Sequence, residues 1–154
     1  MTLLHLAGQI ENPTALTFEQ LATLPQIDDV SQFDPKRSGS AVSLAELAAL
    51  AQPKSGVKYL GLHATSDDFH ASIPLDPILD RAFLIYRQAS GAALDTKAGG
   101  PFRFYIPNHK ACHTDEIDEC ANVKFVDKLE FTIERGFDNR PHDEQEHADL
   151  HAKE

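Results

Sequence analysis

The chain lacks several features that would place it in a class at once. It has no tryptophan, only two cysteines, and no apolar run near the roughly 18 residues of a membrane-spanning helix. Two cysteines in 154 residues exclude a disulfide-rich scaffold. No basic stretch followed by a long apolar segment opens the sequence, so no secretory leader is predicted. We therefore expect a cytoplasmic protein without a membrane segment.

Basic residues are also scarce. The chain has 14 lysines and arginines against 24 acidic residues, which gives a formal net charge of −10. Nucleic acids and anionic membranes require a basic surface, so neither is expected as a partner. A small anionic cofactor remains compatible with this charge, because salt screens charges over about 8 Å and a local basic pocket can act alone. The oligomeric state is left open.

Composition and length favour one soluble domain. Apolar residues make up 42% of the chain, which is ordinary for a globular protein, and 154 residues suffice for a single core. Residues 135–154 differ, because they are rich in histidine and acids and hold almost no apolar side chains. The sequence thus predicts a domain over residues 1–134 and a polar, frayed or disordered tail over 135–154.

Strands with short helices between them are expected along the domain. Thr17 with Gln20, and Ser43 with Glu46, have the spacing of capping boxes, so helices should start after Thr17 and Ser43. An Asp-Pro pair favours one helical turn over residues 76–79. Strands are predicted over residues 57–63, 82–86, 102–106 and, with a period of two, 123–133, and residues 67–74 are expected to form a turn and an edge strand. This order indicates an α+β fold with a mixed β-sheet.

Two basic residues enter strands from distinctive motifs. Residues 99–107 read Gly-Gly-Pro-Phe-Arg-Phe-Tyr-Ile-Pro, and residues 123–124 read Val-Lys. A guanidinium at a strand end offers two charge-assisted donors in fixed geometry, and glycine lets the backbone approach a ligand closely. Arg103 and Lys124, with Gly100 beside them, are therefore candidates for binding an anionic ligand. The alternative is that both cations pair with acids on a solvated sheet face.

The two motifs resemble those of the molybdopterin-binding domain of the sulfite oxidase family, which read roughly G-x-P-x-R-x-x-x-P and V-K-W. Several shorter segments between Gly8 and the second motif also resemble segments of the family, and they occur in the same order along the chain. The resemblance implies the sulfite oxidase-type fold and a molybdenum cofactor (molybdopterin) whose phosphate is held by Arg103 and Lys124. His109 stands in the loop between the motifs and, by position, belongs to the same pocket.

The chain departs from the family's pattern where chemistry would occur. In the family, a cysteine ahead of the helix that here follows Ser43 binds molybdenum, but residues 27–37 contain no cysteine, and Phe125 replaces the motif's tryptophan. We therefore predict a cofactor-binding domain with no catalytic residue. Two alternatives stay open: an active molybdenum-dependent oxidoreductase with an unusual ligand, and a metal- or partner-binding module whose cofactor pocket is empty.

A second candidate site lies in the loop between the motifs. Cys112, His113 and Cys120 are soft ligands suited to Zn, and either cysteine is the candidate ligand for the unusual oxidoreductase. The seven residues between the cysteines do not match a standard zinc knuckle, so a local disulfide and two buried free thiols remain alternatives. His63, His70 and the pair Asp67 and Asp68 lie near a strand end, either as polar pocket residues or in satisfied surface roles.

Overall fold

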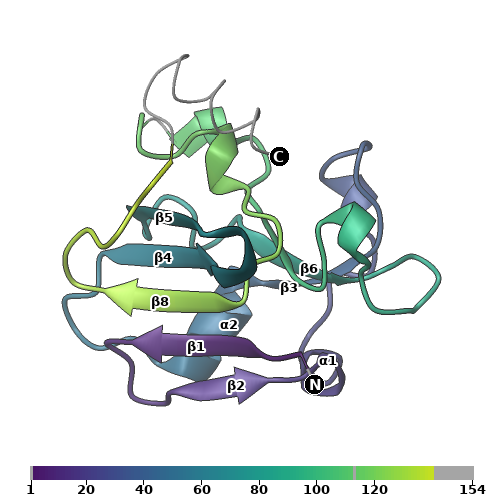
Figure 1. Ribbon diagram of the computed structural model, residues 1–154, viewed down its shortest axis with the longest axis horizontal. Coiled ribbons are helices and arrows are strands. Elements are labelled where there is room, and N and C mark those ends of the chain that lie inside the picture. The colour runs from purple at the N-terminus through teal and green to yellow at the C-terminus, as the bar shows by residue number, and fades with distance from the viewer. Residues whose placement is uncertain (1, 113, 141–154) are drawn as a thin grey trace.

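The architecture consists of two β-sheets with short helices around them (Figure 1). A computed structural model describes residues 2–112 and 114–140. The larger sheet has five strands in the order β2-β1-β8-β4-β5, which are Thr14–Leu16, Leu4–Gly8, Lys128–Thr132, Tyr59–Ala64 and Phe69–Pro74. The smaller sheet has three, β3 (Ser40–Ser43), β6 (Phe83–Arg87) and β7 (Arg103–Tyr105). β1 and β8 pair in parallel and the other pairs are antiparallel, so the predicted mixed α+β fold is confirmed.

Both helix starts predicted from capping residues are confirmed. α1 (Phe18–Leu21) begins after Thr17, whose side chain accepts the Gln20 N–H while the Gln20 side chain accepts the Thr17 N–H. α2 (Leu44–Ala51) begins after Ser43, whose hydroxyl accepts the Glu46 N–H at 3.2 Å. Five 3-10 turns complete the helical structure: η1 (Val30–Gln32), η2 (Thr65–Asp67), η3 (Thr96–Ala98), η4 (His109–Cys112) and η5 (Glu119–Ala121). No helix in the described part of the chain is long and apolar enough to span a membrane.

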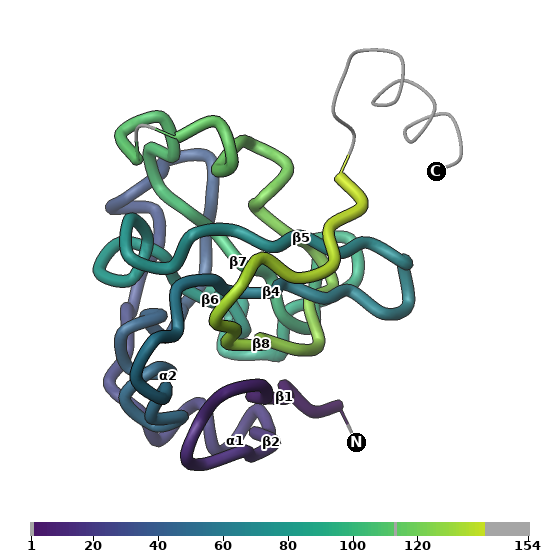
Figure 2. The backbone as a smooth tube through the Cα atoms, turned by 90° about the vertical axis from the view of Figure 1, so that its left-hand side faces the viewer, coloured from purple at the N-terminus to yellow at the C-terminus, as the bar shows by residue number. Residues whose placement is uncertain are grey.

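The three-stranded sheet is buried on both faces. Leu84 and Tyr86 of β6 belong to the main core, which α2 shares with the larger sheet. Phe83 and Ile85 point the other way, because side chains alternate along a strand, and they join a smaller apolar cluster. The rest of the smaller cluster comprises Val30, Ala41, Leu94 and Tyr105. Figure 2 shows the other end of the molecule, where β1, β2 and α1 lie together.

Two elements differ from the sequence-based expectation. The long strand predicted over residues 123–133 is wrong in its first half, because Phe125 adopts a left-handed backbone with φ 58°. Its N–H donates to the Gly99 carbonyl at 2.8 Å, so this stretch joins the glycine turn instead of extending β8. The helical turn predicted over residues 76–79 is a hydrogen-bonded turn instead, in which Ile78 N–H donates to Leu75 O at 3.1 Å.

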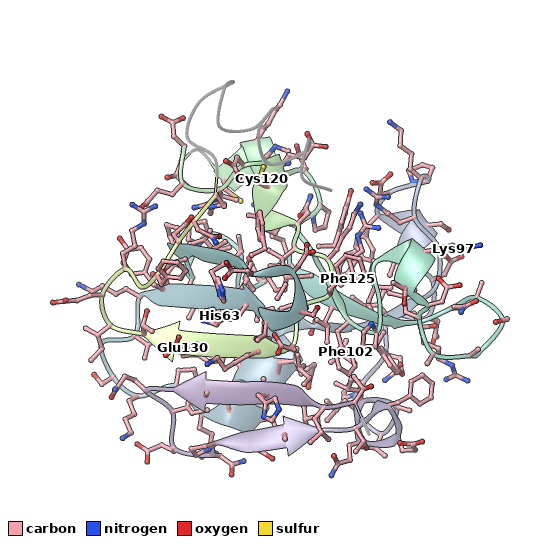
Figure 3. The ribbon with its side chains drawn as sticks, in the orientation of Figure 1. His63, Lys97, Phe102, Cys120, Phe125 and Glu130 are labelled. Atoms are coloured by element: carbon pink, nitrogen blue, oxygen red, sulfur yellow. The ribbon has the colours of Figure 1, made fainter. Side chains whose placement is uncertain are left out.

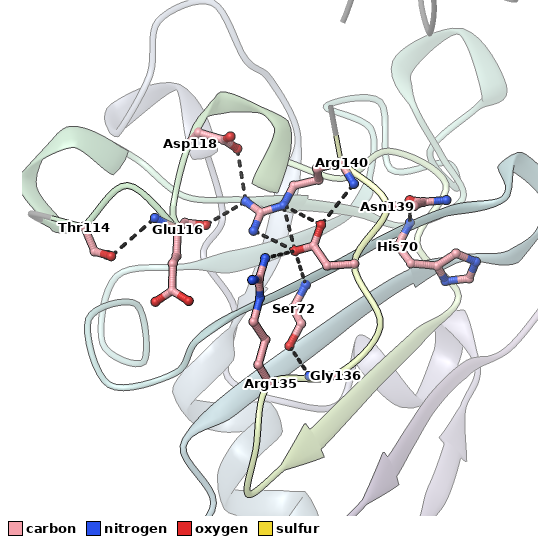
Figure 4. Close-up of polar contacts among 10 residues, drawn as sticks. His70, Ser72, Thr114, Glu116, Asp118, Arg135, Gly136, Asn139 and Arg140 are labelled. Atoms are coloured by element: carbon pink, nitrogen blue, oxygen red, sulfur yellow. Dashed lines mark hydrogen bonds and ion pairs between the residues drawn. The ribbon is translucent and has the colours of Figure 1, made fainter. Parts of the chain in front are cut away.

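The packed structure extends beyond residue 134, where the tail was expected to begin. Asp138 accepts the Ser72 N–H at 2.9 Å, and Asn139 exchanges backbone and side-chain hydrogen bonds with His70, so this segment covers the outer edge of β5. The Arg140 guanidinium lies 2.7 Å from Asp138, and both side chains are almost fully buried, at 5% and 3% exposed. Arg140 also reaches the Glu116 carbonyl and Asp118 (Figure 4). Residues 141–154 lie outside the described part, so the tail prediction for them is untested.

Replacing Asp138 by Asn should lower the free energy of unfolding by about 3 kcal/mol, because it leaves the buried Arg140 charge without its main partner. Urea denaturation measures the loss. Asp80→Asn, which removes an exposed carboxylate, is the matched control and should change stability by less than about 0.5 kcal/mol. Equal effects of the two substitutions would show that the C-terminal segment does not contribute to the packed domain.

Candidate functional site

A glycine turn sets the direction of β7. Asp95 caps η3 by accepting the Ala98 N–H at 3.0 Å, and η3 ends at Gly99 with φ 91°. A Cβ atom at Gly100 would stand only 2.2 Å from the carbonyl oxygen of Leu94. Glycine is therefore required at 100 for packing against the protein's own backbone, which holds the turn and directs the chain into Arg103.

The two cations of the sequence motifs come together at this turn. The position of a Cβ atom at Gly99 lies 3.2 Å from Cδ of Arg103 and 3.1 Å from Cγ of Lys124. They meet because Phe125 and Val126 donate backbone hydrogen bonds to the carbonyls of Gly99 and Phe102. Lys124 is nevertheless exposed and does not line the pocket described next, whereas Arg103 does.

A pocket of about 460 Å³ lies over the smaller apolar cluster, beside Arg103. Four of its lining residues are cations: Lys36, Arg37, Lys97 and Arg103. Asp95 is the one acidic residue among the described lining residues, and Ile85 and Leu94 contribute apolar surface. The pocket is thus strongly basic in a chain whose overall net charge is −10.

Arg37 is the main pocket residue that sequence reasoning missed. Its guanidinium carbon lies 5.4 Å from the centre of the Tyr105 ring, and the Tyr105 hydroxyl donates to the Asp34 carboxylate. The loop reaches this place because Gly39, with φ 106°, passes so close to the Arg87 carbonyl that a Cβ would lie 2.2 Å from it. Lys36 and Arg37 are the last two residues of the cysteine-free stretch 27–37. This pair of adjacent cations was the one signal in the sequence for a basic pocket residue there.

The pocket cations form no ion pair with an acid in the described residues, and Asp34 compensates Arg37 and Lys36 only from a longer distance. No carboxylate in residues 2–112 and 114–140 lies within ion-pair distance of Lys36, Arg37, Lys97 or Arg103. Arg103 donates to the Ala98 carbonyl at 3.2 Å, and the Nε atoms of Arg37 and Arg103 have no acceptor in this part of the chain. Burial, followed by the nearby Arg37 charge, lowers the pKa of Arg103. An anion entering the pocket would relieve both effects.

The thiol loop lies apart from the pocket. Figure 3 shows Cys120 at the top of the molecule and Lys97 at its right-hand side. Cys112 and Cys120 are free and half-buried, so the predicted disulfide alternative is not formed. Burial and then Asp118 raise the pKa of Cys120, which disfavours the thiolate that a metal needs. His109 is half-buried in η4 and does not line the pocket.

The structure gives the predicted zinc site no support. Within the described ranges, no group of three or more histidine, cysteine, aspartate or glutamate side chains is arranged to hold a metal ion. His113, the third residue of the predicted set, lies outside the described residues. Cys112 and Cys120 are half-buried, whereas the free-thiol alternative expected them to be buried.

The histidine cluster forms a hydrogen-bonded chain across the larger sheet, and Figure 3 labels His63 and Glu130 at one end of it. His63 Nε2 lies 2.9 Å from Glu130, its Nδ1 lies 2.7 Å from His70 Nδ1, and His70 Nε2 lies 3.2 Å from Asp68. Burial lowers the pKa of His63, and the opposing effect of Glu130 is smaller, so His63 is neutral. Its Nε2–H then donates to Glu130 and its Nδ1 accepts from His70. The cluster joins β4, β5 and β8, and its residues do not line the pocket.

A basic pocket beside a glycine turn, on a two-sheet α+β scaffold, defines a domain suited to binding an anionic ligand. The family model for the oxidoreductase molybdopterin binding domain matches residues 40–138, and the chain belongs to this family. The match includes Lys97, Arg103 and Lys124, whereas Lys36 and Arg37 precede it. No curated protein matches the chain.

The fold resembles that of a known enzyme. The crystal structure of the sulfane dehydrogenase SoxCD from Paracoccus pantotrophus superposes with a TM-score of 0.65 and 20% sequence identity. The match covers 87% of this chain and 39% of the SoxCD chain, so this chain spans less than half the length of that protein's chain. At this identity the likeness shows the sulfite oxidase-type fold, which confirms the fold expected from the sequence motifs.

Replacing His63 by Gln should flatten the acid dependence of stability. Because burial keeps His63 neutral in the folded state, the unfolded chain binds its proton first, and stability falls as pH drops below about 6.5. The substitution should reduce the slope of unfolding free energy against pH by up to about 1.4 kcal/mol per pH unit, the value for one proton. His5→Gln, at an exposed position, should leave the slope unchanged. The account of His63 would be refuted by identical slopes for wild type and His63→Gln.

Proposed function

We propose that this domain binds a molybdopterin-type cofactor, or a similar anionic ligand, in the basic pocket. The observation that carries the proposal is Arg103, which lies in the family-matched region and lines the pocket with no carboxylate partner in the described residues. Its half-buried guanidinium suits the phosphate end of such a ligand. Lys124, which packs beside Arg103 on Gly99, would add charge at the edge of the site.

The pocket suits the phosphate of a molybdenum cofactor better than its metal. When bound, that cofactor supplies redox chemistry at its metal centre. No cysteine is among the described residues that line the pocket, and none is present in residues 27–37. Cys112 donates to the Pro77 carbonyl at 3.7 Å, and Cys120 lies on η5, away from the pocket. These placements favour a binding role over oxygen-atom transfer by this chain's own residues.

Protein purified from its native host should carry a pterin, which is measured by fluorescence after acid release. Arg103→Ala should reduce bound pterin about 10- to 100-fold, because one charge-assisted hydrogen-bonding group is worth roughly 1.5–3 kcal/mol. Arg81→Ala removes the same charge outside the pocket and should retain the pterin. Thermal unfolding of both variants checks that each is folded.

Two outcomes would overturn the proposal. The first is wild-type protein that carries no pterin and binds none in titration. The second is stoichiometric molybdenum that is lost on Cys112→Ser or Cys120→Ser, which would favour an active oxidoreductase with a thiolate ligand from the loop. Elemental analysis of the same samples distinguishes the second outcome.

A further inference from the structure

We infer that the basic pocket is built for a ligand with two adjacent anionic groups, of the diphosphate class, and that it binds this ligand without a metal ion. The inference deepens the proposed function and rests on it in one respect: both assign ligand binding to the same pocket. It concerns the chemical class of the ligand, which the family match does not specify for this chain.

The positive charge of the pocket is divided between several groups. Four cationic side chains line it together with the carboxylate of Asp95, and the Asp34 carboxylate near Arg37 and Lys36 offsets part of their charge. Two separate guanidinium groups match two anionic groups close together, as in a diphosphate ester, because each can bind one phosphoryl group. Because Lys36 and Lys97 are exposed, their contribution is partly screened, and Arg37 and Arg103 provide the less screened charges.

Arg37 and Arg103 are placed as neighbouring binding groups. Arg103 and Tyr105 are alternate residues of β7, so their side chains leave the same face of the strand. Arg37 lies over the Tyr105 ring, on the face of β7 that also carries Arg103. After burial, the positive charge of Arg37 contributes to the lowered pKa of Arg103. Each planar guanidinium can bind one phosphoryl group in a bidentate manner.

Arg37 is held in position before a ligand arrives. The Tyr105 hydroxyl donates to Asp34, and Asp34 also accepts the Lys36 N–H at 2.9 Å, which fixes the loop that carries Arg37. The hydrogen bond from Tyr105, followed by that from Lys36, lowers the pKa of Asp34, so this carboxylate is ionised near Arg37. A preorganised cation loses little side-chain freedom on binding, and this favours affinity for the anion.

The lining provides nothing for a divalent cation to bind. Magnesium and calcium require several oxygen ligands, usually carboxylates. Asp95 is the one carboxylate among the described lining residues, and its Oδ1 already accepts the Ala98 N–H. The arginines and lysines supply the charge neutralisation that a metal would otherwise provide for a diphosphate. No aromatic side chain is among those lining residues either, so the charged part of the ligand dominates its affinity.

Calorimetric titration of the whole chain with inorganic pyrophosphate and inorganic phosphate, in metal-free buffer, tests the inference. Pyrophosphate should bind at least about tenfold more tightly than phosphate, because it engages both guanidinium groups. Arg37→Gln should reduce this preference to within about threefold, since one of the two groups is lost. Lys97→Gln changes an exposed residue and should also weaken pyrophosphate more than phosphate. Lys54→Gln, an exposed lysine outside the pocket, should leave both affinities unchanged.

Three results would overturn the inference: no preference for pyrophosphate, a preference that survives both Arg37→Gln and Lys97→Gln, or an equal loss in Lys54→Gln. A requirement for added magnesium would overturn its metal-independent part. The pyrophosphate titration and the pterin assay can fail independently of each other. A pterin-loaded protein without pyrophosphate preference contradicts only this inference, whereas the preference without any pterin contradicts only the proposed cofactor.

Discussion

The guanidinium of Arg103 is held half-buried at the end of a strand, and its Nη1 donates to a backbone carbonyl 3.2 Å away. No carboxylate in residues 2–112 and 114–140 pairs with it, and a second arginine lies beside it. Confining like charges in a partly desolvated place costs free energy, which the rest of the fold must offset. The packing of Gly100 against Leu94, the Tyr105–Asp34 hydrogen bond and the buried faces of the three-stranded sheet all maintain this arrangement. A site that is unfavourable when empty and favourable when an anion is present is typical of a binding pocket.

The pocket shares no residue with the two other polar clusters of the described structure, those of His63 and Arg140. The His63 chain links strands of the larger sheet, and Arg140 secures the C-terminal segment against β5 and the loop before η5. In both clusters each of these side chains has at least one hydrogen-bond or ion-pair partner within the cluster. Arg103 and Arg37 differ from them because each keeps a donor without an acceptor in the described residues. Arg81 also keeps such an Nε in the described residues, but only Arg37 and Arg103 line the pocket, and this pair is the basis of the proposed ligand site.

Local patterns predicted much of the fold. Capping at Thr17 and Ser43, the apolar run of β6, the alternation in β7 and the Gly-Gly-Pro turn are decided by neighbouring residues, so a sequence alone reveals them. Long-range contacts were missed. The left-handed backbone at Phe125 depends on its hydrogen bond to Gly99. Residues 135–140 are held by hydrogen bonds that Asp138 and Asn139 accept from the distant Ser72 and His70. Neither contact has a local signal. For the site, the motifs located Arg103, but Arg37 comes close to it only through the three-dimensional path of its loop.

Nitrogen-15 NMR of the arginine Nε–H groups tests the central claim most directly, because each guanidinium reports its own environment. Arg37, Arg103 and Arg81 all have an enclosed Nε without an acceptor in the described residues, but only Arg37 and Arg103 line the pocket. The account predicts that an added phosphate or diphosphate anion shifts the Arg103 and Arg37 signals and leaves the Arg81 signal in place. Unchanged signals for Arg37 and Arg103 at saturating anion, or equal shifts for all three arginines, would contradict it.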